Sequence, residues 1–305
     1  MHETVTASFD GAVRLADWGV IRAAGPDAAS FLHAQLTQDI IGLEVGRARL
    51  AGYCSAKGRL LASFVVWRSA ADELLLACSA DLLAPTLKRL SMFVLRAKCK
   101  LTDASAELPL FGVAGATARA AGEPWQCVSS DRGTLIRLPD ARGVAGGVPR
   151  ALAIGDPALP ALDAAAWAWL EVGSGVPRIV AATVEQFVPQ MVNLELVGGV
   201  NFQKGCYPGQ EIVARSQYRG TLKRRAFLFS SEAAAQPGQE IFHEDDREQP
   251  AGMVANSASF EGRHRVLAEL KLAALGSGRL HLGAPDGPLL QREDLPYPVP
   301  LEAAA

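Results

Sequence analysis

The chain has 305 residues, of which 49% are hydrophobic and 20% are charged, and its net charge is -2. This composition is typical of an ordered globular protein and excludes a disordered or fibrous chain. The near-neutral charge argues against a protein that coats nucleic acid. The length predicts two domains, with three as the alternative.

No apolar run reaches the roughly 18 residues needed to cross a bilayer, and the N-terminal sequence MHETVTASFD is acidic where a secretory signal would be basic. We therefore expect a cytoplasmic protein without a membrane partner. The five cysteines are scattered and never form a C-x-x-C pair. They are expected to be reduced thiols, with no disulfide framework and no metal site.

Short apolar runs with a period of two dominate the first half of the chain and predict strands. We expect these strands at 13–15, 20–23, 47–54, 59–68, 73–79, 99–102, 111–114, 126–129, 134–138 and 151–154. The runs 47–54 and 59–68 should pair as a hairpin with its turn at 55–58. The second of these runs ends in the β-favouring sequence FVVW. Strands interleaved with only a few helices indicate an α+β protein.

Three helices are predicted in this first part. One opens at Gly25-Pro26-Asp27 and carries Ala28, Leu32 and Leu36 on one face. A second begins at Asp81 with Pro85 in its first turn, and a third carries Leu162, Ala166, Trp169 and Leu170 and stops near Gly173.

After Arg225 the pattern changes to short extended runs separated by Pro, Gly and charged turns. We predict a small antiparallel barrel over 221–305, in which the Pro-rich segment 295–301 is a trailing strand or strap.

The stretch QKGCYPGQEIVARSQYRGTLKRR, residues 203–225, has the composition of a reactive site. In extended backbone Lys204 and Cys206 lie on one side, and an ammonium beside a thiol favours the thiolate. Pro208 is predicted as the first residue of a helix, with Gln210 and Glu211 in its first turn, so that the helix N-terminus would also act on Cys206. The alternative is an inert, buried cysteine beside a helix cap.

Five basic residues and no acid follow within this stretch: Arg215, Arg219, Lys223, Arg224 and Arg225. Such a cluster suits carboxylates or a phosphate backbone, or it forms a solvated surface.

The run KGCYPGQE, followed by VAR and RG, resembles the motif K-G-C-[FY]-x-G-Q-E of the YgfZ family. These are folate-binding proteins related to the aminomethyltransferase (T-protein) of the glycine cleavage system. FLHAQLTQDI, YCSAKGRLL, LEVGSGVPRI and VPQMVNLELVGGVNF agree with it, so the resemblance runs from about Phe31 to the C-terminal region. It implies an α+β, T-protein-like fold, with a two-lobed folate-binding region over 1–220 and the C-terminal barrel over 221–305.

The resemblance implies tetrahydrofolate, with or without a polyglutamate tail, as the cofactor. Glu171 matches the T-protein glutamate that binds the pterin ring, and a carboxylate can accept hydrogen bonds from the 2-amino group and N3-H side by side. The aromatic candidates to stack on the rings are Tyr53, Phe64, Trp67 and Tyr207. The remaining expected folate-binding residues are Gln210 and Glu211, with Arg215, Arg219 and Arg225 on the glutamate tail.

The implied role is assembly or repair of iron-sulfur clusters and, through cluster enzymes, tRNA modification, with client enzymes or assembly factors as partners. Cys206 would be the reactive thiol near bound folate, with Lys204 supporting its thiolate. T-proteins carry an aspartate on the strand that corresponds to 58–64, whereas this chain has no acid there. An aminomethyltransferase or demethylase therefore remains the alternative, with the missing acid against it. A nucleic-acid-binding protein is the third reading, which rests on the basic cluster alone, and we expect no direct nucleic-acid partner.

Overall fold

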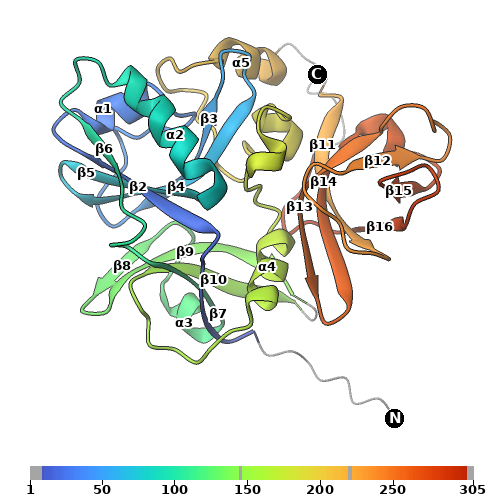
Figure 1. Cartoon of the computed structure of the whole chain (residues 1–305), viewed down its shortest axis with the longest axis horizontal. Helices are drawn as coiled ribbons and strands as arrows, with labels where there is room; N and C mark the ends of the chain where they lie inside the picture. The colour runs from blue at the N-terminus through green and yellow to red at the C-terminus, as the bar shows by residue number, and fades with distance from the viewer. Residues whose placement is uncertain (1–8, 144–145, 219–221, 301–305) are drawn as a thin grey trace.

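A computed structural model of the protein describes residues 9–143, 146–218 and 222–300. In this part of the chain two five-stranded antiparallel sheets and a closed antiparallel barrel are joined by a few short helices. Figure 1 shows the two sheets stacked on one side of the molecule and the barrel on the other, with helix α4 between them. The predicted α+β architecture with a C-terminal antiparallel barrel is confirmed.

The first sheet has the strand order β3-β4-β5-β2-β6. The predicted hairpin is present, since β3 and β4 pair with Ala51 opposite Phe64. Its strands are β2 Trp18–Ala24, β3 Ala48–Cys54, β4 Leu60–Ala70, β5 Glu73–Ser79 and β6 Lys100–Asp103.

The second sheet has the strand order β1-β7-β10-β9-β8. A β-bulge interrupts the pairing of β9 with β10 between Val148 and Arg150. The strands are β1 Gly11–Arg14, β7 Leu110–Ala114, β8 Cys127–Ser130, β9 Gly133–Arg142 and β10 Gly147–Ile154.

The helices largely follow the predicted apolar faces. Helix α1 ends at His33, so Leu36 lies beyond it, and the five-residue α3 was not predicted because it is too short to show a helical period. The α-helices are α1 Ala28–His33, α2 Ala80–Phe93, α3 Ala116–Ala120, α4 Ala164–Gly173 and α5 Gln210–Tyr218. The segment predicted as a loop after Gly173 contains two 3-10 turns, η1 Ala181–Thr183 and η2 Pro189–Val192.

The barrel begins at Arg224 and closes in the order β11-β14-β13-β12-β15-β16. Its strands are β11 Arg224–Ser231, β12 Glu240–His243, β13 Gly252–Phe260, β14 Arg263–Lys271, β15 Leu280–Leu282 and β16 Leu289–Glu293, with a 3-10 turn η3 at Leu272–Leu275. The segment after Glu293 is a strap and not a strand, and Tyr297 fixes it by donating to the Gly175 carbonyl at 2.7 Å.

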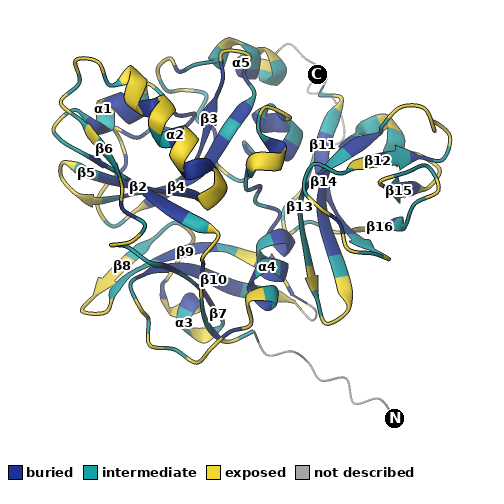
Figure 2. Ribbon diagram, viewed as in Figure 1, coloured by how far each residue is buried: buried dark blue, intermediate teal, exposed yellow. Residues whose placement is uncertain are grey.

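Separate apolar cores hold these layers together, and Figure 2 shows the buried residues along the strands and α4. One core lies between the two sheets and includes Val65, Ile136 and Trp167. A second lies on the other side of the first sheet, where α1 and α2 pack. Val172 of α4 packs against Leu228 and Leu267 of the barrel, so α4 joins the barrel to the sheets. No helix in the described ranges is long and apolar enough to span a membrane.

Candidate functional site

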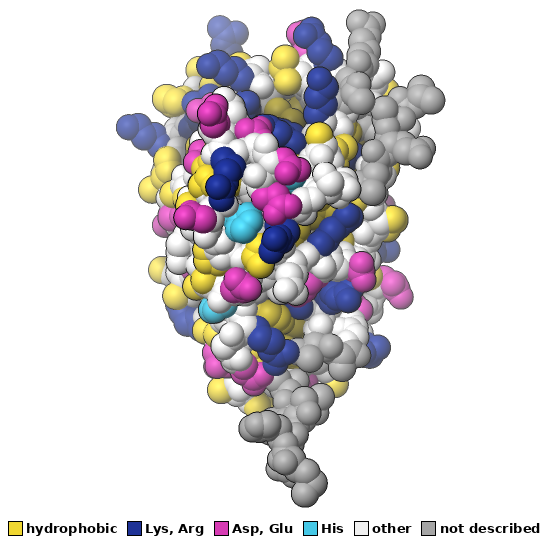
Figure 3. All heavy atoms as spheres, turned by 90° about the vertical axis from the view of Figure 1, so that its right-hand side faces the viewer, with side chains coloured by type: hydrophobic (Ala, Val, Ile, Leu, Met, Phe, Trp, Pro, Cys, Tyr) yellow, Lys and Arg dark blue, Asp and Glu magenta, His cyan; other side chains and the backbone are white. Residues whose placement is uncertain are grey.

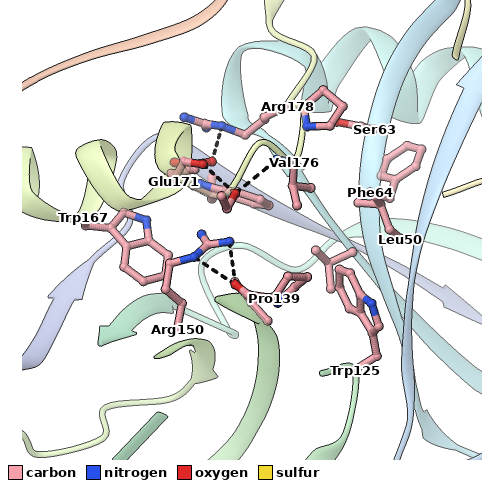
Figure 4. A pocket seen from close by; sticks show the side chains of 15 residues that line it. Leu50, Ser63, Phe64, Trp125, Pro139, Arg150, Trp167, Glu171, Val176 and Arg178 are labelled. Carbon is pink, nitrogen blue, oxygen red and sulfur yellow. Dashed lines mark hydrogen bonds and ion pairs between the residues drawn. The ribbon is translucent and has the colours of Figure 1, made fainter. Parts of the chain in front are cut away.

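A pocket opens where the two sheets, α4 and the segment after α4 meet (Figure 4). The empty space between its walls is about 460 Å³, a volume that includes solvent at its open mouth. Its walls combine aromatic rings with a small set of charged and polar groups. The lining residues are Trp18, Leu50, Ser63, Phe64, Val65, Trp125, Leu138, Pro139, Arg150, Trp167, Glu171, Ser174, Val176, Pro177 and Arg178.

Helix α4 supplies one wall of the pocket. Asp163 caps its N-terminus by accepting from the Ala165 amide at 2.7 Å. Trp167 and Glu171 are four residues apart and therefore share a face. The Trp167 ring lies directly on Gly112 of β7, where a Cβ atom would come within 2.3 Å of the ring, so only glycine admits this packing.

Glu171 reaches the pocket surface with a side chain that is 15% exposed. Its Oε1 lies 2.8 Å from Arg178 Nε. Burial raises the pKa of Glu171, and Asp17 adds to this, while Arg178 and Arg150 act in the opposite direction. Burial therefore makes this carboxylate harder to ionise than a free glutamate.

Arg178 is held on three sides. Its Nη2 lies 2.6 Å from Asp17 Oδ2, and its guanidinium stacks at 4.9 Å from the centre of the Trp18 ring. Asn256 of the barrel strand β13 binds both the amide and the carbonyl of Arg178, at 3.1 and 2.8 Å. Although burial acts against it, Glu171 and Asp17 hold the pKa of Arg178 above its usual value. The barrel therefore helps to position the partner of Glu171.

Strand β4 presents Ser63 to the pocket in the segment where a carboxylate is missing. The Ser63 hydroxyl accepts from the Ile179 amide at 3.0 Å. Among the residues that line the pocket, Glu171 is the only acid.

The structure places the four aromatic residues predicted to stack on the ligand in different surroundings. Phe64 lines the pocket, whereas Trp67 is buried between the sheets and Tyr53 in the core beneath α1 and α2. Tyr207 is also buried, under Lys204, whose Nζ lies 4.8 Å from the ring centre. Phe64 is therefore the one of the four that borders this pocket, and its side chain is 1% exposed and packs in the same core as Tyr53.

The residues from Gln203 to Tyr218 form a second candidate site, here called the cysteine loop with α5. Lys204 lies against the end of α1, where its Nζ donates to the carbonyls of His33 and Leu36, the latter at 2.9 Å. Burial lowers the pKa of Lys204 to about 8, and Asp39 and Cys206 oppose this shift. Lys204 thus joins the loop to α1 as well as lying near Cys206.

Cys206 is exposed, which excludes the alternative of an inert buried thiol. The prediction that Pro208 is the first residue of the helix is wrong, because α5 begins at Gln210. Gly209 intervenes with a φ of +78°, and a Cβ there would meet the Ser55 carbonyl oxygen at 2.4 Å. This close approach to the hairpin turn displaces the helix start, so Cys206 does not immediately precede the helix.

The structure does not bring the cysteine loop and Glu171 together. None of the described residues 203–218 lines the pocket. Val213 of α5 packs in the core on the far side of the first sheet, with α1 and α2. Gln210, Glu211 and Arg215 lie on α5, where Glu211 and Arg215 are exposed. Arg219 lies outside the described residues.

Arg225 is buried in the interior. It forms an ion pair with Glu195, and both side chains are at most 5% exposed. Its Nη1 also donates to the Gln190 carbonyl at 3.1 Å. This guanidinium lies away from the pocket and is engaged in holding η2 against β11.

Replacing Arg225 by Met is expected to lower the free energy of unfolding by about 3 to 5 kcal/mol, because Glu195 would remain buried without its partner. The double variant Arg225→Met, Glu195→Gln should recover much of this loss. Urea denaturation of the three proteins measures the effect. A loss below about 1 kcal/mol in the single variant would show that the pair is not structural.

Sequence reasoning missed Arg150, Arg178 and the tryptophans Trp18, Trp125 and Trp167 at the pocket. One signal was available for Arg150, a single charge in the otherwise apolar strand run 148–154. The tryptophans gave no signal because aromatic residues are equally common in cores. Among the described residues, His, Cys, Asp and Glu side chains form no cluster of three or more suited to a metal ion.

The fold places this chain in the T-protein class. The GCVT N-terminal domain family matches residues 11–131. The glycine cleavage system aminomethyltransferase T of Bartonella henselae superposes with a TM-score of 0.71 over 95% of this chain and 86% of that protein. Their sequence identity is 15%, so this likeness concerns the fold alone.

Within that class, proteins with closely related sequences identify the family. The chain is 36% identical over 253 residues to the tRNA-modifying protein YgfZ of Edwardsiella ictaluri, covering 74% of this chain and 72% of that protein. It is 32% identical over 294 residues to the protein of the same name from Vibrio vulnificus, covering 92% and 90%. The chain belongs to the YgfZ family.

Proposed function

We propose that this protein binds a reduced folate in the pocket beside α4 and acts in the cytoplasm in the assembly or repair of iron-sulfur clusters and, through cluster enzymes, in tRNA modification. The observation that carries the folate proposal is Glu171, a carboxylate on the wall of an aromatic pocket. Such a carboxylate accepts from the 2-amino group and N3-H of a pterin, and the partly exposed rings of Trp18 and Trp125 offer faces for the pterin ring. The name of the relatives supports a connection with tRNA modification.

The cysteine loop supports the second half of the proposal. Cys206 is exposed beside the partly buried ammonium of Lys204, and it lies outside the pocket. A thiol placed in this way is accessible to a partner protein while folate is bound elsewhere. We propose client enzymes or assembly factors of iron-sulfur clusters as these partners.

Titration calorimetry with tetrahydrofolate at low salt tests the folate proposal. Binding with one ligand per chain supports it. Absence of heat with every reduced folate, confirmed by equilibrium dialysis, would exclude this function for the pocket.

We propose that a polyglutamate tail long enough to leave the pocket strengthens binding through Arg215, which is exposed on α5 outside the pocket, since Arg225 is internal. We expect Arg215→Ala to weaken binding of the pentaglutamate about two- to fivefold while leaving the monoglutamate unchanged, because exposed ion pairs contribute little. The difference should shrink with added salt. Arg247→Ala, an exposed change in the barrel, is the control. An equal change in the dissociation constants of the pentaglutamate and the monoglutamate would show that the tail does not contact Arg215.

An aminomethyltransferase is the second candidate because of the fold. The pocket offers Ser63 in place of a β4 acid, and Glu171 is paired with Arg178. We therefore expect turnover of an aminomethyl-lipoyl substrate with tetrahydrofolate to be more than tenfold below that of a genuine T-protein. A rate within tenfold, measured side by side, would favour the transferase.

Direct nucleic-acid binding is the remaining candidate, and it rests on the basic residues within 215–225. On the barrel face shown in Figure 3, Lys and Arg side chains alternate with Asp and Glu, without a large area of one sign. An RNA shift assay at increasing salt decides this question, since phosphate contacts produce a steep salt dependence.

A further inference from the structure

Arg150 of β10 is a buried cation that no acid among the described residues pairs with at ion-pair distance. It is 3% exposed. Its hydrogen bonds go from Nε and Nη2 to the Pro139 carbonyl, at 3.3 and 3.2 Å. Burial is the main cause that lowers the pKa of Arg150 to about 10. Buried charges are normally paired, so this guanidinium needs an explanation.

The position of Arg150 in the pocket wall offers an explanation for its unpaired charge. It lines the same pocket as Glu171, and its guanidinium lies 5.6 Å from the centre of the Trp167 ring. Figure 4 shows the guanidinium and the Glu171 carboxylate on the same side of the pocket, across from Phe64 and Trp125. The pocket wall therefore presents hydrogen-bond donors next to an acceptor.

We infer that Glu171 and Arg150 together recognise a 2-amino-4-oxopyrimidine edge, in which Glu171 accepts from the 2-amino group and N3-H and Arg150 donates to the 4-oxo oxygen. This edge carries an acceptor beside two donors, which is the complement of a guanidinium beside a carboxylate. The inference rests on the proposed function of the pocket and adds its basis of selectivity. A 4-amino group would direct its own N-H toward Arg150, so the site should reject 4-amino analogues.

The edge occurs in two kinds of molecule, the pterin of folates and guanine. The hydrogen bonds of Arg150 to Pro139 also brace the β-bulge next to it, which is a structural role. A brace would affect all ligands alike, whereas recognition of the 4-oxo oxygen affects only ligands that carry it.

The experiment measures dissociation constants by calorimetry for tetrahydrofolate, its 4-amino analogue tetrahydroaminopterin, and guanosine. The proteins are the full-length chain, Arg150→Met, Arg150→Lys, and the exposed control Arg247→Met. We expect the unaltered protein to prefer tetrahydrofolate over the 4-amino analogue by at least about tenfold. In Arg150→Met, tetrahydrofolate should bind about 10- to 100-fold more weakly, as expected for a lost charge-assisted hydrogen bond, while the analogue binds as before or more tightly. Arg150→Lys should be intermediate.

Circular dichroism and thermal melting check that each variant is folded. If Arg150→Met does not fold, the comparison of ligands is made with Arg150→Lys. An equal loss for both folates, or an unchanged ratio in a folded variant, would overturn the inference and leave folate binding intact. Failure of all three ligands to bind the unaltered protein would overturn both proposals. Tighter binding of guanosine than of tetrahydrofolate would support recognition of the 2-amino-4-oxopyrimidine edge and would identify guanine, in place of a pterin, as the group that carries it.

Discussion

Replacing Glu171 by Gln is expected to weaken tetrahydrofolate binding about 100-fold. The carboxylate can accept two charge-assisted hydrogen bonds from the pterin, and each is worth about 1.5 to 3 kcal/mol. The amide of Gln retains one acceptor and presents an NH₂ group to a ligand edge that is itself a donor. The variant also removes one of the two acidic partners of Arg178, whose Nε lies 2.8 Å from Glu171 Oε1, and leaves Asp17 in place. Titration calorimetry measures the change in the dissociation constant.

The pH dependence of this effect follows from the raised pKa of Glu171. In the proposed binding mode the ligand meets the ionised carboxylate, so affinity should rise with pH as Glu171 loses its proton. The stability of the free protein should respond in the opposite sense. Because the folded pKa lies above the unfolded value, the contribution of Glu171 is fully present below the usual pKa of 4.5 and is lost as pH rises through the folded value.

The contributions of Glu171 to the pH dependence of ligand affinity and to the pH dependence of stability should both disappear in Glu171→Gln. The comparison uses the difference between the two proteins, since Glu195 and Glu269 also have raised pKa values and contribute to the total. Glu248→Gln, an exposed change in the barrel, is the matched control. Wild-type affinity in Glu171→Gln would show that the pterin does not contact this carboxylate.

Cys206 is expected to react with iodoacetamide at pH 7 at least about 100-fold faster than Cys54, Cys78 and Cys127. Burial is the main cause that raises the pKa of each of these three thiols to about 12. At pH 7 only about one in 10⁵ of such thiols is the reactive thiolate. Burial also raises the pKa of Cys99, which is partly buried. Peptide mapping after a short pulse gives the relative rates.

Two variants refine this test. Cys206→Ser should leave folding and folate binding unchanged, because Cys206 lies outside the pocket, yet it should lose function in cells, seen as reduced tRNA thiolation. Lys204→Ala should slow alkylation of Cys206 without unfolding the protein, although the end of α1 loses a donor to its carbonyls. Labelling of Cys206 no faster than the four other cysteines would make the thiol structural, and the loop would lose its proposed role.

The sequence alone predicted the elements that depend on local pattern. The hairpin of β3 and β4 was predicted because period-two alternation and a turn are properties of neighbouring residues. The barrel was predicted from repeated short runs and turn residues, and α4 from its apolar face and its stop at Gly173. The family, and with it Glu171 and Cys206, came from the resemblance carried by KGCYPGQE and LEVGSGVPRI. The short α3 left no such pattern.

Tertiary structure decided how the candidate site residues are grouped. Arg225 looked like part of one basic cluster with Arg215, but the packing of β11 against η2 buries it on Glu195. The start of α5 depends on a close contact between Gly209 and the turn at Ser55, which local propensity does not encode. Arg150, Glu171 and Phe64 come from three elements far apart in sequence, and only the docking of the two sheets and α4 brings them to one pocket. Local sequence sets the conformation of a segment, whereas burial and the partner of a charge are set by which segments pack together, and this depends on the whole chain.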